Sequence, residues 1–246
     1  MSAYEIHECR FGSRTVVYAH DYKAAGTTVL AMVRELCPNA VKLYQSSHKG
    51  RLLPDPGNPT KSFGENYTLF TFVRDPVERF QSGLFELSVR HDKWINNMIS
   101  LKEDKMKKAM ENKKKNAFNV TVASLAIEDL LHRTRGAYVD PHIQPQALFF
   151  IDKNQRTLPL SYVGVVSPNF EQEIQTIAVK LFGWTDAKGS VIKALQDKSH
   201  ARDSHDLVYR SRAIENGNVR DEHIDDITKN NIHRFYDIDY ACFGFT

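Results

Sequence analysis

Residues 20–30 read HDYKAAGTTVL and directly follow a short β-branched stretch, TVVYAH, at residues 15–20. Apolar residues then recur with helical spacing over residues 27–36, up to a Cys-Pro-Asn sequence at 37–39. β-branched runs favour strands, and a proline after a periodic segment marks the end of a helix. This part of the chain therefore predicts a strand, a tight turn and a helix.

The turn has the composition of an anion-binding site. Backbone N–H groups at a helix N-terminus have no partner within the helix and carry partial positive charge, so we expect Ala25, Gly26, Thr27 and Thr28 to cradle a phosphate. Glycine lets the backbone approach the anion closely, and Lys23 adds a full charge. A nucleoside triphosphatase loop places its lysine after the glycine. Here the lysine comes first, which argues against an ATPase or a GTPase.

A second turn of the same kind follows residues 67–73, YTLFTFV, which predict a strand covered on both faces. The strand runs into Arg74, then Asp75 as a helix cap, then a proline that suits the first helical turn. Arg74 and Ser82 are candidate ligands of a second phosphate. The alternative is an ion pair of Arg74 with Asp75 or Glu78 at the start of the helix.

The other segments continue the alternation of strands and helices. We expect strands at residues 40–45, 147–151 and 160–166, and helices at 120–133, 169–183 and 225–236. This order predicts an α/β fold, a P-loop-like three-layer sandwich with a central, mainly parallel sheet flanked by helices, in one domain spanning residues 1–246. Ligands of such sheets lie beyond the carboxyl ends of the strands, where Lys23 and Arg74 both fall.

The composition is that of an ordinary globular protein, with 41% hydrophobic and 26% charged residues. The net charge of +3 is too small to indicate a nucleic-acid or membrane partner, and we expect neither. A lysine-rich segment at residues 101–115 is either a solvated helix face or a patch for a polyanion.

The cysteines and the N-terminal sequence bear on the cellular compartment of the protein. Three scattered cysteines, Cys9, Cys37 and Cys242, predict reduced and mostly buried thiols. Without a signal peptide or a run of ~18 apolar residues, we expect a cytoplasmic protein, or a Golgi lumenal one if the chain is part of a longer protein. Two glycosylation sequons, residues 66–68 and 119–121, point weakly to the lumen.

Several segments resemble sulfotransferases that use 3′-phosphoadenosine 5′-phosphosulfate (PAPS), most closely the Golgi-type carbohydrate sulfotransferases. HDYKAAGTT and FVRDPVERFQSGLFE are similar to the two cofactor motifs of that family. HIQPQ, YVGVVSPNFEQEI and FYDIDYACFGF are similar to further family motifs, so that the resemblance covers nearly the whole chain. We expect no transmembrane anchor of the kind typical of the Golgi enzymes, and Val165-Val166 stands where Arg-Phe is common in the family.

The resemblance implies sulfuryl transfer from PAPS to a hydroxyl, or less commonly an amine, of a small molecule or glycan, without a metal. Lys23 and the backbone of residues 25–28 would hold the 5′ phosphosulfate, and Arg74 and Ser82 the 3′ phosphate. Arg79 would support the helix or a neighbouring carboxylate.

In-line transfer also needs a group that accepts the proton of the acceptor hydroxyl. His48, at the sheet edge, is one candidate, since its unperturbed pKa near ~6.5 suits this role. His142 and Glu86 are the other candidates, whereas His20 is expected to shape the turn. The competing functions are a small-molecule or nucleotide kinase, which would need Mg²⁺, and a non-catalytic binding module that uses the lysine-rich segment. The acceptor and the oligomeric state are not encoded in a readable way.

Overall fold

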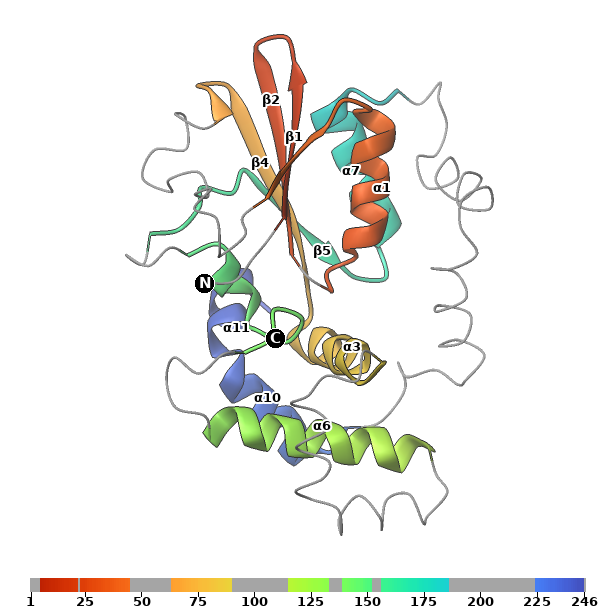
Figure 1. Cartoon of the computed structure of the whole chain (residues 1–246), viewed down its shortest axis with the longest axis vertical. Coiled ribbons are helices and arrows are strands. Elements are labelled where there is room, and N and C mark those ends of the chain that lie inside the picture. The colour runs from red at the N-terminus through yellow and green to blue at the C-terminus, as the bar shows by residue number, and fades with distance from the viewer. Residues whose placement is uncertain are drawn as a thin grey trace. The chain divides into compact units, whose positions relative to one another are not determined.

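The structure, a computed structural model, describes residues 5–21, 23–44, 63–89, 115–132, 139–151, 156–185 and 224–245. The chain forms two compact units (Figure 1). The first unit comprises residues 1–75 and 146–203, and the second comprises residues 76–145 and 204–246.

The first unit is built on a five-stranded sheet of order β3-β1-β2-β4-β5. Its strands are β1 (Glu5–Phe11), β2 (Arg14–His20), β3 (Val41–Tyr44), β4 (Tyr67–Arg74) and β5 (Tyr162–Val166). The pairs β2–β4 and β4–β5 are parallel, whereas β1 is antiparallel to both β2 and β3. Four strands therefore run in one direction and only β1 runs against them, so the prediction of an α/β fold with a mainly parallel sheet is confirmed.

Strand β1 is the part of the sheet that sequence analysis does not predict. It forms a hairpin with β2 across Gly12, whose φ of 59° suits a tight turn. It also buries two polar side chains, those of His7 and Glu8. Because these residues interrupt the apolar alternation typical of a strand, the segment carries no clear local signal.

Strand β4 lies between β2 and β5, and its composition fits that central place. Leu69, Phe70, Phe72 and Val73 are all completely buried. A strand covered on both faces needs apolar residues in succession rather than in alternation, which is the pattern that predicted it.

Two helices pack on one face of this sheet, α1 (Gly26–Leu36) and α7 (Phe170–Phe182) (Figure 1). Their apolar faces join one core with β2 and β4, formed by Tyr18, Val29, Met32, Val33, Phe70, Phe72, Ile174, Ile177 and Ala178. Gly183 ends α7 in a left-handed conformation (φ 69°), as its place after the last apolar residue predicts.

The strand predicted at residues 147–151 is wrong. Residues Gln146–Phe149 form a short 3₁₀ helix, η1. Short apolar runs do not distinguish strand from helix, and here the run is buried as a helical turn with Ala147 and Phe149 inside.

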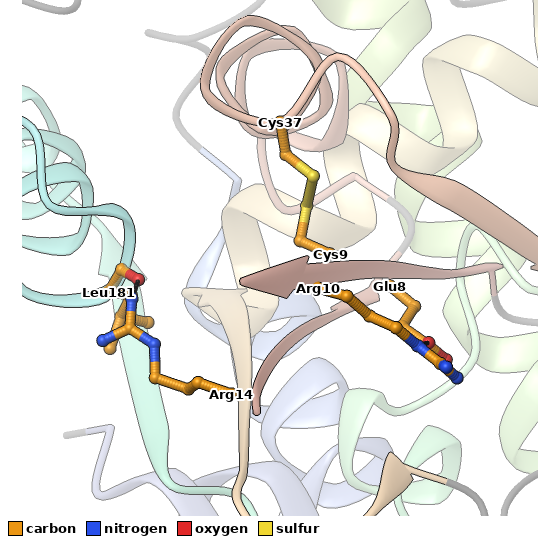
Figure 2. The surroundings of a disulfide bond; sticks show 6 residues. All are labelled: Glu8, Cys9, Arg10, Arg14, Cys37 and Leu181. Atoms are coloured by element: carbon orange, nitrogen blue, oxygen red, sulfur yellow. Dashed lines mark hydrogen bonds and ion pairs between the residues drawn. A yellow bond between two sulfur atoms is a disulfide. The ribbon is translucent and has the colours of Figure 1, made fainter. Parts of the chain in front are cut away.

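Cys9 and Cys37 form a disulfide, so the prediction of reduced thiols is wrong for this pair (Figure 2). The bond joins β1 to the end of α1 across a Cα–Cα distance of 6.1 Å, and both residues are buried. Close by, the Arg14 side chain donates a hydrogen bond to the carbonyl of Leu181 at the end of α7 (Figure 2). Cys242 is free and exposed.

The second unit contains α3 (Pro76–Val89), α6 (Lys115–His132), α10 (Asp226–Phe235) and α11 (Asp237–Phe243). Their shared core includes Phe80, Leu84, Leu87, Ala126, Ile127, Leu130, Ile232 and Tyr236. Asp225 caps α10 by accepting a hydrogen bond from the N–H of Thr228 at 2.7 Å. The final helix, α11, is not predicted, because the chain bends at Tyr236 and then resumes a helix that Gly244 ends.

Candidate functional site

The turn between β2 and α1 has an unusual backbone. Lys23 and Ala25 have φ angles of 67° and 56°, in the left-handed region that non-glycine residues seldom adopt. Each such residue costs about 1 to 3 kcal/mol, and strain of this kind is concentrated at ligand-binding sites. Left-handed residues in a turn also direct backbone N–H groups toward a common point, which forms a concave anion site.

Helix α1 begins without a side-chain cap. Ala25 occupies the capping position, and its carbonyl accepts the N–H groups of Thr28 at 3.0 Å and Val29 at 3.1 Å. An alanine offers no oxygen to the first N–H groups of the helix, whereas most helices use serine, threonine, aspartate or asparagine there. A bound anion would take the role of the missing cap.

His20 sets the position of the turn. Its ring stacks on that of Tyr18, with centroids 5.9 Å apart. A Cβ atom built on Gly26 would lie 1.8 Å from Nε2 of His20, so the ring leaves no room for a side chain there. This packing agrees with the expectation that His20 shapes the turn.

The flanks of the turn are firmly held. Asp21 and Ala24 are completely buried, whereas Lys23 and Thr28 are only half-buried. The side chain of Thr27 lies outside the described residues. The turn therefore combines buried anchors with a lysine that keeps access to solvent.

Arg74, the last residue of β4, is clamped through its backbone by Gln146. The N–H of Arg74 donates to Oε1 of Gln146 at 2.8 Å, and Nε2 of Gln146 donates to the carbonyl of Arg74 at 2.7 Å. Gln146 is completely buried, so these two bonds form away from water. This glutamine is the last residue of the HIQPQ motif, but nothing in the motif predicts the clamp, which joins residues 72 positions apart.

Lys23 and Arg74 belong to the same edge of the sheet. Strands β2 and β4 are parallel neighbours, and their carboxyl ends therefore reach the same side, where ligands of α/β sheets bind. Lys23 lies three residues beyond the end of β2, and Arg74 is the end of β4. We call this edge, with the turn of residues 23–28 and Arg74, the anion edge. Strand β3 also ends on this side, but His48, which follows it in the chain, lies outside the described residues.

In the second unit, α3 carries the candidates Ser82 and Glu86. Ser82 and Glu86 are half-buried and lie one helical turn apart on one face. Arg79 is completely buried and donates to the carbonyls of Pro141, at 3.0 Å, and Gln144. Arg79, predicted to support the helix or a carboxylate, thus supports the loop of residues 139–145.

That loop holds His142 in a defined orientation. Asp140 Oδ1 accepts the backbone N–H of His142 at 2.8 Å and lies 2.6 Å from Nδ1 of its ring. The Tyr236 hydroxyl donates to the carbonyl of Ile143, and a Cβ on Gly83 would lie 2.3 Å from the carbonyl oxygen of His142. In a neutral ring, a carboxylate at Nδ1 favours the tautomer that carries its proton there, which leaves the lone pair on Nε2. The sequence motif indicates His142 but gives no sign of the role of Asp140.

The chain has an α/β fold in which the parallel strands β2 and β4 end at one edge of the sheet, where ligands of such sheets usually bind. The sequence profile described as the sulfotransferase family matches residues 14–246, and the chain belongs to that family. It is accordingly an enzyme that transfers sulfuryl groups.

Neither the curated proteins nor the solved structures contain a match to this chain. The Golgi-type carbohydrate group therefore stays a resemblance. Within the described residues, no helix is both long and apolar enough to span a bilayer.

Proposed function

We propose that this protein transfers a sulfuryl group from PAPS to a hydroxyl group of a small molecule or glycan. The observation that carries the proposal is the anion edge. There the strained turn that contains Lys23, at the start of α1 where no side chain caps the helix, lies at the end of one strand, and Arg74, whose backbone is held by Gln146, lies at the end of the neighbouring strand. PAPS has two separated phosphate positions, and two neighbouring cationic turns suit a donor of that kind. Because the family profile runs through both units, we propose that they form one catalytic domain.

Lys23 and the backbone of residues 25–28 would bind the 5′ phosphosulfate. The left-handed Ala25 leaves the start of α1 without a cap, so the helix N-terminus and the Lys23 ammonium can both face an anion. When bound, PAPS supplies the sulfuryl group and a phosphate that departs with the electron pair of the broken S–O bond. Positive charge from Lys23 and the helix N-terminus stabilises the negative charge that develops on this phosphate.

Arg74 and Ser82 would bind the 3′ phosphate. Arginine presents several donors in one plane and matches a phosphate well. The Gln146 clamp holds the backbone of Arg74 while its side chain stays half-exposed. A pre-oriented arginine loses less conformational entropy when it binds the donor.

We assign the proton acceptor to His142, with His48 and Glu86 as the alternatives. The Asp140–His142 pair has the arrangement of a general base whose tautomer is set by a carboxylate. Arg79 and Tyr236 bind the carbonyls on either side of His142, so the loop has little freedom to reorient its ring. His142 would take the acceptor's hydroxyl proton at Nε2 while the oxygen attacks sulfur.

Donor binding is tested by thermal melting with 3′,5′-adenosine bisphosphate, with and without Mg²⁺, and with ATP. At 100 times Kd, a ligand adds about 2.7 kcal/mol of stability. In a protein of this size we expect the melting temperature to rise by about 5 to 10 °C. Lys23→Ala should abolish the shift, whereas Lys180→Ala, on the exposed face of α7, should keep it. A Mg²⁺-dependent shift with ATP and no shift with the bisphosphate would indicate that the protein is a kinase instead.

Sulfuryl transfer and the base are tested by mass spectrometry. A pool of candidate alcohols and glycans is incubated with enzyme and PAPS, and products heavier by one sulfuryl group are sought. His142→Gln should abolish product formation while the bisphosphate melting shift stays intact. If His48→Gln or Glu86→Gln has this effect and His142→Gln does not, the base is the residue that was changed.

A further inference from the structure

The Cys9–Cys37 disulfide carries information about where this protein folds. Its Cα–Cα distance of 6.1 Å lies within the usual range for disulfides, and both residues are at least nine-tenths buried. Disulfides form and persist in oxidising compartments and are rare in the cytosol. The bond thus argues for the lumen of the secretory pathway, against the cytoplasmic location expected from sequence.

The same compartment modifies asparagine in Asn-X-Thr sequences, and the sequon Asn66-Tyr67-Thr68 has a suitable place in the fold. Asn66 is exposed, and so are Gly64 and Glu65 before it. The carbonyl of Asn66 accepts the N–H of Thr15 at 2.9 Å, which anchors its backbone at the start of β4. An exposed side chain on an anchored backbone can carry a bulky, solvated sugar without disturbing the core.

The position of Asn66 also keeps a sugar away from the anion edge. Asn66 precedes the first residue of β4, and Arg74 is the last. At about 3.3 Å per residue, the strand separates the two residues by roughly 25 Å. A glycan on Asn66 would therefore leave the donor site open.

From these two observations we propose that Asn66 is a site of N-linked glycosylation, modified in the same oxidising compartment in which the Cys9–Cys37 bond forms. In the modification, the amide nitrogen of Asn66 forms a bond to the first sugar of a lipid-linked oligosaccharide. The lipid diphosphate leaves with the electron pair, and the amide loses one proton. In the oxidation, two thiols lose two protons and two electrons to a disulfide carrier, which is reduced to a dithiol. The proposal goes beyond the transfer reaction and does not depend on it.

The glycan is tested on the full chain, expressed behind a cleavable secretion signal in cultured animal cells. Treatment with a peptide N-glycosidase should lower the intact mass and convert Asn66 to aspartate in the peptide map. Asn66→Gln and Thr68→Ala should each abolish the modification, whereas Thr68→Ser, which preserves the sequon, should retain it. An unmodified Asn66 would overturn the proposal, and so would a glycan found only on Asn119.

The disulfide is tested by counting thiols in the same preparation. The denatured, unreduced chain should expose one reactive thiol, that of Cys242, and reduction should raise the count to all three cysteines. Three reactive thiols before reduction would overturn the proposal. Both readouts are masses rather than activities, so a failure here is distinct from a failure of the bisphosphate melting test.

Discussion

Replacing Gln146 with methionine tests whether its side chain positions Arg74. Methionine has nearly the same length and fits irregular space in a core, but it has no strong donor or acceptor. Gln146→Met therefore removes two hydrogen bonds, of 2.8 and 2.7 Å, and leaves the N–H and the carbonyl of Arg74 without these partners. The volume of the completely buried side chain is largely kept.

The expected loss of stability follows from these two groups. A buried backbone group that loses its partner costs about 1 to 3 kcal/mol, so the pair costs about 2 to 6 kcal/mol. At about 2 to 4 °C per kcal/mol for a protein of this size, Tm should fall by at least about 4 °C in calorimetry. Because Arg74 is less well held, Kd for 3′,5′-adenosine bisphosphate should rise severalfold in titration calorimetry at a temperature where the variant is folded.

Two variants serve as controls. Gln172→Met, on the exposed face of α7, should shift Tm by less than about 2 °C. Gln146→Glu should depend on pH, because burial beside the Arg74 carbonyl raises the pKa of the introduced carboxyl above its unfolded value of ~4.3. The protonated form can donate to that carbonyl, so stability is retained at low pH and is lost as pH rises above the unfolded value of ~4.3 and through the raised folded-state pKa. If Gln146→Met has the same Tm and the same Kd for the bisphosphate as the Gln172→Met control, the Gln146 side chain does not position Arg74.

Gly26→Ala should abolish the bisphosphate melting shift, because its Cβ would lie 1.8 Å from Nε2 of His20. Adding His20→Ala should restore most of the shift; a double variant as impaired as the single one would show that this contact is not the cause. Ala25→Gly should raise the free energy of unfolding in urea by about 1 kcal/mol, because glycine adopts a φ of 56° without strain; an unchanged midpoint would argue against strain in the turn. Burial, followed by the hydrogen bond to Glu173 and its charge, raises the pKa of Tyr162 to about 12. The stabilisation by Tyr162 is therefore complete below pH ~10 and is lost as pH rises toward 12, and in an absorbance titration Tyr162→Phe should lose the amplitude of one tyrosine near pH 12.

Local pattern was sufficient for the elements that surround the anion edge. The strands β2 and β4 and the helix α1 lie within a residue or two of their predicted bounds, and α3 begins at the proline expected in its first turn. Each is encoded by its own periodicity, and α7 also ends at the glycine that predicts its end. The order of strand, turn and helix then led to the parallel sheet and to the edge that carries Lys23 and Arg74.

Contacts between distant residues were decided by tertiary structure alone. Strand β1 exists because β2 and β3 pair with it, not because of its own pattern. The disulfide joins cysteines 28 residues apart, and Gln146 holds a strand end 72 residues away. Arg79 likewise reaches a loop more than 60 residues further along the chain. Nothing in the composition near such a residue specifies its partner, because a hydrogen bond or a disulfide depends on distance in space, and the packed core sets that distance.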